Sequence, residues 1–270
     1  MSGRPGVLVS GSAAGIGRAT AERFARAGWL VGVYDVDDAG VERAVRELSA
    51  AHGEDAVVGG HLDVTEPAQW EAALAGFTEA SGGRLDVLVN NAGVLHGGRF
   101  ADVPLAAHRR TIEINVQGTV NGCHAAHPYL RATPGACVVN LCSASAIYGQ
   151  AELASYSASK FAVRGLTEAL ELEWRKEDIR VRAVWPLFVA TAMTDGLHIA
   201  STDALGVKLT AEDVAEEVYA AALPRTGRLA RVLPPRVHTA VGRPAKVLAA
   251  AADLVPSFVS REVNRRIARS

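Results

Sequence analysis

The chain alternates short apolar runs with longer segments in which apolar and polar residues recur at helical spacing. The first two apolar runs, residues 7–9 and 30–34, are separated by an amphipathic segment, residues 18–27. Continuous apolar runs of this length are typical of strands buried on both faces of a parallel sheet. The pattern therefore predicts an α/β fold that begins with a strand, a turn, a helix and a second strand.

The alternation continues to residue 222, and no linker divides the 270 residues, so we expect one domain over residues 1–270. Residues 192–209 are expected to form a long lid-like loop, and residues 237–270 a C-terminal tail. Further strands are expected at 56–61, 87–89, 136–141, 180–184 and 231–233. Helices are expected at 39–51, 65–80, 104–130, 156–175 and 210–222.

Three glycines follow the first strand with the spacing Gly11-x-x-x-Gly15-x-Gly17. Glycine adopts positive φ and lets the backbone approach a bulky anion, while the free amides that start the next helix receive pyrophosphate. About twenty residues further on, Asp35 ends the second strand, where a carboxylate accepts hydrogen bonds from an adenosine ribose. A glycine-rich turn alone also serves tight packing, but the strand, helix and acid together indicate a dinucleotide site.

Tyr156 and Lys160 lie four positions apart at the start of a predicted helix, so both side chains share one face. A free phenol has a pKa near ~10, and an adjacent cation lowers that pKa by stabilising the phenolate. Ser143 follows the fifth predicted strand, at the edge where open parallel sheets bind ligands, and Ser145 is a rival hydroxyl. This spacing indicates a proton-transfer site.

These motifs, with the turn Asn90-Asn91-Ala92-Gly93, resemble the classical short-chain dehydrogenase/reductase family over residues 7–191. The resemblance implies a Rossmann-like, doubly wound parallel sheet of about seven strands in the order 3-2-1-4-5-6-7. It also implies NAD as the cofactor, because Asp35 suits a ribose 2′-hydroxyl and repels a 2′-phosphate. Ser10 stands where the family usually has Thr, and Leu187 stands where it usually has Gly.

The resemblance also implies a role for each of four catalytic residues. Tyr156 transfers the substrate proton, and Ser143 binds the substrate oxygen. Lys160 lowers the pKa of the tyrosine and holds the nicotinamide ribose. Asn115 opens its helix and holds a water that connects Lys160 to solvent, although a polar amide there also suits a simple contact with solvent or a carbonyl.

Cofactor contacts follow from the same resemblance. Asp63 and its neighbour are expected beside the adenine ring, with a helix cap as the alternative role for the acid. The implied cofactor-binding residues are Gly11, Ser12, Gly15, Ile16, Gly17, Asp35, Asp63, Val64, Asn90, Ala92, Gly93, Tyr156, Lys160, Val189 and Thr191.

The expected activity is NAD(H)-dependent interconversion of a hydrophobic secondary alcohol and a ketone. Two alternatives stay open: an epimerase or dehydratase that uses bound NAD transiently, and a nucleotide sensor without turnover. The residues expected to border the substrate are largely apolar and also suit a packed core. They are Val94, Leu95, Ala146, Ile147, Tyr148 and the lid around Leu197, with His96 as a polar contact.

Charge and cysteine content limit the classes of partner and the cellular compartments that we expect. The net charge of −1 disfavours nucleic acid, and three cysteines without a CxxC pair favour the reducing cytosol. No run reaches the ~20 apolar residues of a membrane span, and no leader precedes the first strand. Eight histidines show no metal-ligand spacing, and His124 and His127, one helical turn apart, are expected to be a polar stripe. We therefore expect no metal.

Assembly and the tail leave alternatives open. The resemblance implies a homo-oligomer, a tetramer or a dimer, with the helices at 105–130 and 156–175 in the main contact. The tail contains an apolar stretch at 247–255, followed by four arginines. The tail either forms a terminal helix that covers the pocket or a partner subunit, or it lies at a membrane interface.

Overall fold

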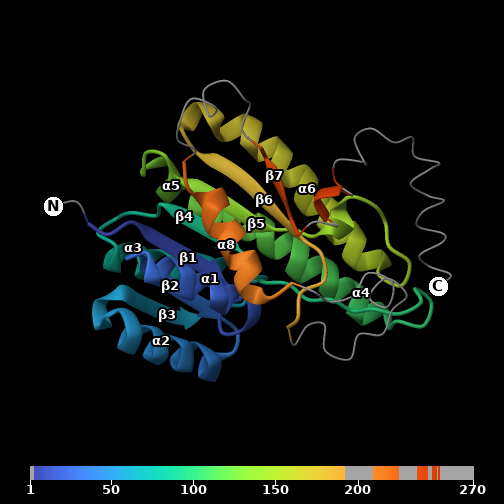
Figure 1. Ribbon diagram of the computed structural model, residues 1–270, viewed down its shortest axis with the longest axis horizontal. Coiled ribbons are helices and arrows are strands. Elements are labelled where there is room, and N and C mark those ends of the chain that lie inside the picture. The colour runs from blue at the N-terminus through green and yellow to red at the C-terminus, as the bar shows by residue number, and fades with distance from the viewer. Residues whose placement is uncertain (1–2, 192–208, 225–235, 243–244, 248, 250–270) are drawn as a thin grey trace.

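The computed structural model describes residues 3–191, 209–224, 236–242, 245–247 and 249. These residues form one parallel sheet in the order β3-β2-β1-β4-β5-β6-β7 (Figure 1). Its strands are β1 (Gly6–Ser10), β2 (Leu30–Asp35), β3 (Val57–His61), β4 (Val87–Asn90), β5 (Cys137–Leu141), β6 (Arg180–Pro186) and β7 (His238–Val241). The predicted class and strand order are confirmed.

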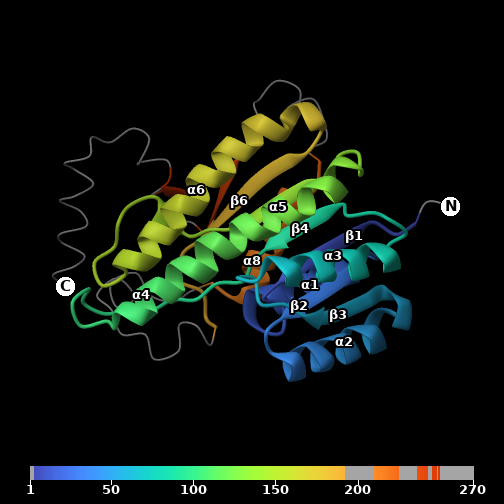
Figure 2. The ribbon, with the colours of Figure 1, turned by 180° about the vertical axis from the view of Figure 1, so that it is seen from behind.

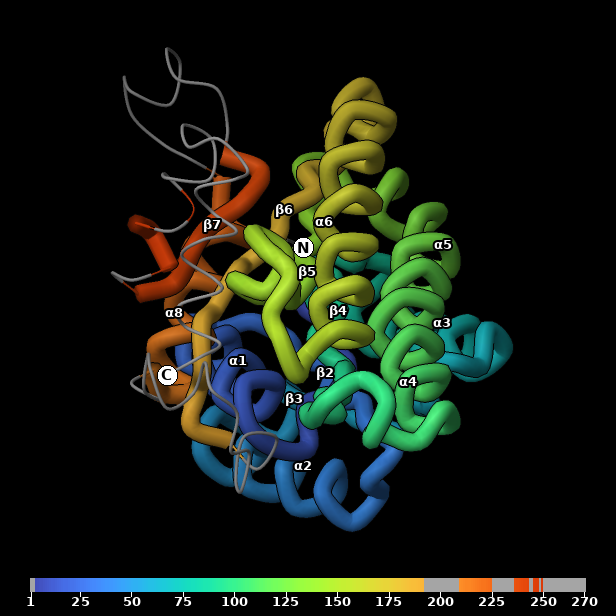
Figure 3. Tube along the Cα trace, turned by 90° about the vertical axis from the view of Figure 1, so that its right-hand side faces the viewer, coloured from blue at the N-terminus to red at the C-terminus, as the bar shows by residue number. Residues whose placement is uncertain are grey.

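Helices cover both faces of the sheet. On one face lie α1 (Gly15–Arg26), α2 (Asp38–His52) and α8 (Ala211–Ala222). On the other face lie α3 (Pro67–Ala80), α4 (Leu105–Ile112), α5 (Gly118–Arg131) and α6 (Ala154–Trp174) (Figure 2). Figure 3 shows the sheet between α1 and α8 on one side and α5 and α6 on the other.

The first strand shows why its sequence is continuously apolar. Val7 and Val9 pack in a cluster with Phe24 of α1, whereas Leu8 packs in a second cluster with Trp70 of α3. Side chains alternate between the two faces of a strand, and here both faces are covered by helices. Every residue of β1 is consequently buried.

The sheet also fixes where a ligand can bind. From β1 the chain passes outward to β2 and β3, and then returns to the other side of β1 to form β4. Parallel sheets bind ligands at the carboxyl ends of the strands, next to the point where the strand order reverses. Ser10 ends β1 and Asn90 ends β4, so this point lies directly after those two residues.

One predicted helix is interrupted. The segment expected to be helical over 104–130 comprises α4, a π-helical turn at Glu113–Gln117, and α5. A π turn is a local widening that is frequent at functional sites. It contains Asn115, which is the residue that was expected to open the helix.

The seventh strand lies on other residues than predicted. It is β7, which pairs with β6 and comprises His238–Val241, whereas 231–233 lies outside the described residues. β7 is a partly exposed edge strand whose one fully buried residue is Val241, so its apolar signal is weak. The tail expected from residue 237 therefore starts with a strand.

Other expectations fall on residues that are not described or concern absences. Most of the predicted lid at 192–209 and most of the apolar stretch at 247–255 lie outside the described residues. Among the helices that the structure describes, none combines the length and the apolar character that a membrane crossing needs.

The predicted helix at 210–222 is confirmed as α8, which starts with a capping box between Thr210 and Asp213.

Candidate active site

The glycine turn after β1 requires glycine at two positions for different reasons. Gly11 has φ +65°, and a Cβ there would lie 2.7 Å from the Cα of Ala92. A Cβ on Gly17 would lie 2.1 Å from the carbonyl oxygen of Gly11. The turn is therefore packed directly against the start of α1 and against the turn after β4. This packing leaves a backbone cradle at the helix start, as a pyrophosphate requires.

Asn91 connects the two turns. Its Nδ2 donates to the carbonyl oxygens of Ser10, at 3.0 Å, and Gly11, at 2.7 Å. The Ser10 hydroxyl in turn accepts from the backbone amides of Asn91 and Ala92, at 3.2 and 3.3 Å. Ser10 thus supplies the hydroxyl that the usual threonine would supply.

One cavity is lined by Gly11 and Gly15 of the glycine turn and by Asp35, which lies at the end of β2. Its carboxylate accepts from the amide of Ala13 at 3.0 Å and from the amide of Asp37 at 3.2 Å. Arg18 points away, because its guanidinium pairs with Glu22 and Glu47. The acid fits a ribose diol, which donates hydrogen bonds, and a 2′-phosphate there would meet a carboxylate.

The next acid, Asp63, lies in the cavity wall beside Val64. It accepts from the amide and hydroxyl of Thr65, at 2.9 and 2.7 Å, and lies 3.6 Å from Arg110. Partial burial acts to raise the pKa of Asp63, but these hydrogen bonds and the arginine outweigh it, so the pKa lies below its usual value. The acid is therefore ionised at neutral pH, and it also bonds the segment that leads into α3.

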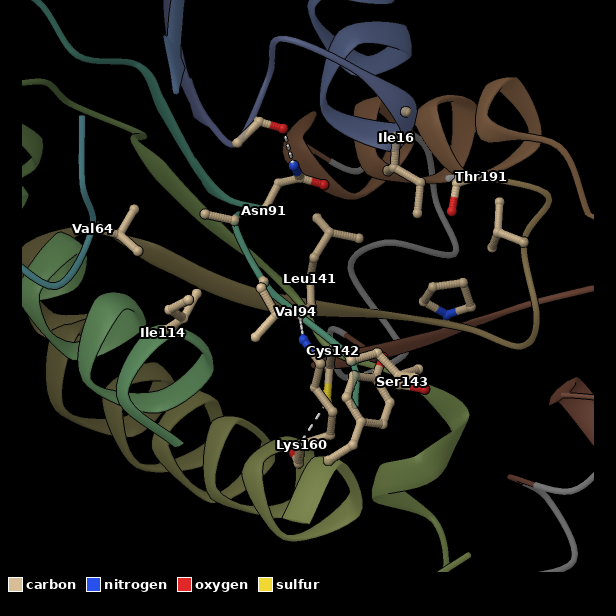
Figure 4. Close-up of a pocket in the computed structure, with 18 of the residues that line it drawn as sticks. Ile16, Val64, Asn91, Val94, Ile114, Leu141, Cys142, Ser143, Lys160 and Thr191 are labelled. Atoms are coloured by element: carbon tan, nitrogen blue, oxygen red, sulfur yellow. Dashed lines mark hydrogen bonds between the residues drawn. The ribbon is translucent and has the colours of Figure 1, made fainter. Parts of the chain in front are cut away.

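The proton-transfer residues lie at the other end of the cavity. Figure 4 shows Ser143 and Lys160 there, with Val64 and Ile114 on one side and Ile16 and Thr191 on another. Lys160 is 5% exposed, its Nζ donates to the carbonyl oxygen of Leu141 at 2.9 Å, and it lies 5.6 Å from the centre of the Tyr156 ring. The spacing on α6 thus brings the ammonium close to the phenol, as predicted.

Titration of these groups is governed by burial. Burial raises the pKa of Tyr156 to about 12, although the Ser143 hydroxyl acts to lower it. Burial lowers the pKa of Lys160, although nearby Cys142 opposes the shift. The expected low pKa of the phenol is thus absent from the protein alone, because desolvation of the phenolate exceeds the effect of its neighbours.

Asn115 uses its whole side chain for contacts within the protein. Its Oδ1 accepts from the amide of Val94 at 2.8 Å, and its Nδ2 donates to the carbonyl of Val94 and to the Ser159 hydroxyl, at 2.9 and 3.0 Å. Ser159 donates to the carbonyl oxygen of Tyr156 at 2.7 Å. Asn115 therefore ties the turn after β4 to the helix that carries Tyr156.

An apolar wall surrounds Tyr156. Leu153 and Phe188 are buried together, and Leu95, Leu187 and Tyr156 pack against them. Leu187 has no positive φ, so the leucine fits the backbone where the family has glycine. The expectation for Ala146 and Ile147 is wrong: both pack in a separate core cluster under α6 and do not line the cavity. Tyr148 is also absent from the cavity wall.

The predicted cofactor residues divide into two groups. Ser12, Gly17 and Asn90 do not line the cavity, because the first two pack behind the glycine turn and Asn90 bonds Asn140 inside the sheet. The others do line it. They are Gly11, Gly15, Ile16, Asp35, Asp63, Val64, Ala92, Gly93, Tyr156, Lys160, Val189 and Thr191.

Sequence reasoning missed several residues of the cavity wall. Asn91 was available within its motif, but Arg110, Gln150 and Phe188 carry no local signal that separates them from loop or core positions. His96, expected as a polar contact, bonds Thr111 and is not in the wall. Among the described residues no group of three or more potential metal ligands occurs, and His127 bonds Glu177.

Solved structures share this architecture. A short-chain dehydrogenase/reductase from Burkholderia phymatum, solved in complex with NAD, superposes with a TM-score of 0.80 at 27% identity, covering 96% of this chain and 95% of that one. A 3-ketoacyl-(acyl-carrier-protein) reductase from Brucella melitensis, complexed with NADH, gives a TM-score of 0.77 at 27% identity, covering 88% and 96%.

Sequence comparison gives relatives of the same kind. Trans-4-hydroxycyclohexanecarboxylate dehydrogenase of Sinomonas cyclohexanicum is 38% identical over 194 residues, 70% of this chain and 74% of the relative. A 3-alpha-(or 20-beta)-hydroxysteroid dehydrogenase of Mycobacterium bovis is 37% identical over 188 residues, 70% of each protein. The model of the short chain dehydrogenase family matches residues 6–201. The chain belongs to the short-chain dehydrogenase family.

Proposed function

We propose that this protein is an NAD-dependent dehydrogenase that interconverts a secondary alcohol and a ketone. One observation carries the proposal: a single cavity is lined by the glycine turn and Asp35 at one end and by Ser143, Tyr156 and Lys160 at the other. The two structural neighbours, solved with NAD and with NADH, support the choice of cofactor.

The residues present fit the dinucleotide. The close contact between Gly17 and the Gly11 carbonyl keeps a backbone cradle free of side chains, where a pyrophosphate is bound. Asp35 would hold the adenosine ribose, and Asp63 and Val64 would lie beside the adenine. Bound NAD supplies a nicotinamide ring that accepts hydride from an alcohol carbon, or as NADH returns it to a ketone.

The proton-transfer residues have distinct tasks. In oxidation Tyr156, as phenolate, removes the proton from the alcohol's hydroxyl group, while the hydride leaves the carbon that carries this hydroxyl. Ser143 donates a hydrogen bond to the substrate oxygen, and Lys160 supplies positive charge near the phenolate and binds the nicotinamide ribose. Asn115 keeps the turn at Val94 and the helix of Tyr156 in register, and we propose that it also holds a water that connects Lys160 to solvent.

The wall around Tyr156 favours a hydrophobic substrate. Leu95, Leu187 and Phe188 offer apolar surface but few hydrogen bonds, so they select for carbon rings or chains next to the reacting carbinol. The two relatives described above are named for a hydroxycyclohexane carboxylate and for hydroxysteroids. We therefore propose an alicyclic secondary alcohol as the substrate class.

We also propose a homo-oligomer, a dimer or a tetramer, formed through α4, α5 and α6. In Figure 2, α4 and α5 follow one another in line, and α6 runs beside them on the same face. Large apolar side chains are exposed on all three, which in a soluble protein indicates contact with a partner. They are Leu105, Ile112, Val120, Phe161 and Leu172.

A reducing compartment is the location we propose. The cysteines at positions 123, 137 and 142 are buried free thiols. Burial raises the pKa of Cys123 to about 12 and that of Cys142 to about 11, so both remain protonated and unreactive.

The test is NADH formation at 340 nm by purified protein with NAD or NADP. The panel is cyclohexanol, trans-4-hydroxycyclohexanecarboxylate and a 20β-hydroxysteroid, and Tyr156→Phe is run in parallel. Turnover with NAD that is lost in the variant supports the proposal. Conversion of substrate without net NADH supports an epimerase or dehydratase. Binding of NAD without any conversion supports a nucleotide sensor.

A further inference from the structure

A chain of four hydrogen-bonding side chains leads away from Ser143. The Ser143 hydroxyl donates to the Ser145 hydroxyl at 3.2 Å, and Ser145 donates to Oε1 of Gln150 at 3.1 Å. Nε2 of Gln150 then donates to the Tyr148 hydroxyl at 3.2 Å. The mechanism above uses only the first member of this chain.

The middle of the chain is buried within the wall of the cavity. Ser145 is 2% exposed and Gln150 is 6% exposed, and both line the cavity next to Ser143. The backbone amide of Gln150 donates to the Ser157 hydroxyl at 3.1 Å, so the loop is anchored to the helix of Tyr156. Buried polar side chains retain such bonds because water cannot replace them.

The direction of the chain matters for the role of Ser143. A serine hydroxyl has one hydrogen, and in this arrangement Ser143 directs it to Ser145. To donate to a substrate oxygen, Ser143 must turn that hydrogen into the cavity. The backbone amide of Ser145 already donates to one lone pair of the Ser143 oxygen at 3.1 Å, and the second lone pair, which then faces the Ser145 hydroxyl, has room for a further donor.

The chain provides that donor by reversing. When the Gln150 amide turns over, its Nε2 donates to Ser145, and the Tyr148 hydroxyl donates to Oε1. Ser145 then donates to Ser143, which is free to donate into the cavity. Every member both donates and accepts, so no covalent bond changes and no proton is gained or lost. Hydrogen bonds in series strengthen one another, which makes Ser143 a better donor to developing negative charge.

We infer that Gln150 is a positioning residue that acts through Ser145 to orient the hydroxyl of Ser143 toward the substrate oxygen. The inference rests on the proposed function. A side chain that only accepts, such as glutamate, fixes the chain in the direction away from the cavity. A methionine of similar size cannot donate to Ser145, and its thioether sulfur accepts only weakly.

The first experiment is a double-mutant cycle with Ser145→Ala and Gln150→Met, using whichever panel alcohol the wild type oxidises. Each single change is expected to lower kcat about tenfold, the size of one hydrogen bond to a charged group, with the KM for NAD within about twofold. The double variant is expected to match Ser145→Ala alone, because the chain is already broken there. Ser155→Ala serves as the matched control, because the hydroxyl of Ser155 bonds His108 and takes no part in the hydrogen-bond chain that starts at Ser143.

The second experiment uses Gln150→Glu across pH. A protonated carboxyl both donates and accepts, whereas a carboxylate only accepts. Activity relative to wild type is therefore expected to be higher at acidic pH and to fall as the new carboxyl ionises. The same ratio for Gln150→Met is expected to be constant with pH. A purely structural role for Gln150 would give two flat ratios.

The outcomes separate this inference from the proposed function. If the wild type oxidises no alcohol, the proposed function fails and the inference fails with it. If the wild type turns over and Tyr156→Phe does not, but Ser145→Ala and Gln150→Met keep more than half of kcat, only the inference is overturned. Multiplicative losses in the double variant also overturn it, because they indicate two independent effects.

Discussion

The side-chain amide of Asn91 donates a 2.7 Å hydrogen bond to the carbonyl oxygen of Gly11, across 80 positions of the sequence. A second bond from the same amide reaches Ser10. Replacing Asn91 with Asp removes these donors and puts a negative charge beside the pyrophosphate cradle. We expect the free energy of unfolding to fall by about 1–3 kcal/mol and NAD to bind more weakly.

Asn140→Asp is the matched control for Asn91→Asp. Asn140 is also a buried asparagine in a hydrogen-bond network, but it lies inside the sheet and not in the cavity wall. It should lose stability in denaturant titrations and keep its Kd for NAD. Equal Kd values for the two variants would remove the proposed link between Asn91 and the cofactor.

A methyl group at Gly17 should distort the cradle. The added Cβ would lie 2.1 Å from the carbonyl oxygen of Gly11 and 2.5 Å from Nδ2 of Asn91, so the turn must shift. We expect Gly17→Ala to weaken NAD binding roughly 10- to 100-fold, as measured by calorimetry. Gly76→Ala on α3 meets nothing within 4 Å, and it should raise stability by about 0.5–1 kcal/mol without changing the Kd.

Cofactor choice should depend on Asp35. Removing its carboxylate in Asp35→Ala abolishes repulsion of a 2′-phosphate, and we expect the preference for NAD over NADP to fall roughly 10- to 100-fold in kcat/KM. Some loss with NAD itself is also expected, because the acid accepts from the amide of Ala13. Asp38→Ala, which removes an exposed acid paired with His61, should leave the preference unchanged.

The pH profile of alcohol oxidation should depend on Ser143. Its hydroxyl acts to lower the pKa of Tyr156, which burial raises to about 12, so its removal raises that pKa further. Oxidation needs the phenolate, and activity therefore rises with pH. In Ser143→Ala we expect kcat to fall about 10²–10³-fold and the rise to move to higher pH. An unshifted profile would mean that the serine does not affect the tyrosine.

Charge on the exposed face of α6 should break the proposed oligomer. Leu172 is 67% exposed and Phe161 is 42% exposed on α6. We expect Phe161→Glu combined with Leu172→Glu to reduce the mass measured by light scattering to that of a monomer. Ala75→Glu, on the exposed side of α3, controls for added charge. A wild type that is already monomeric would contradict the assembly proposal.

The strands and helices were largely predictable because both faces of this sheet are covered. Burial on two faces makes β1, β2 and β5 largely apolar, and the chain alternates them with amphipathic helices. The exception, β7, is a partly exposed edge strand with little apolar content. Its position depends on pairing with β6, which no local pattern reports.

Site residues were predictable where a motif fixes the position of the backbone. They were less predictable where the direction of a side chain decides whether it reaches the cavity. Asn90 and Asn91 are neighbours in one motif, yet the first points into the sheet and the second toward the glycine turn. Ser12 has the same ambiguity, and its hydroxyl bonds Val9 and Tyr34. Gln150 belongs to no motif, and only the folded loop brings it to Ser145.

The pKa of the candidate catalytic tyrosine shows a second kind of limit. The four-residue spacing of Tyr156 and Lys160 correctly predicts a shared helix face. The spacing contains no information on how strongly that face is shielded from water. Desolvation is nevertheless the main cause of the raised pKa of Tyr156 in the protein alone. Burial is a property of the whole fold, since Leu95, Leu153 and Phe188, which lie far apart in the sequence, pack in one cluster with Tyr156.

The bonds that join the glycine turn to Asn91 also have a consequence for how the protein folds. They connect segments about eighty residues apart, so the cradle forms only after β1 and β4 have paired. Contacts between distant segments form slowly, because a long loop must close first. Recovery of NAD binding during refolding should therefore lag behind the recovery of helical signal. The time at which NAD binding returns would report when the two halves of the sheet join.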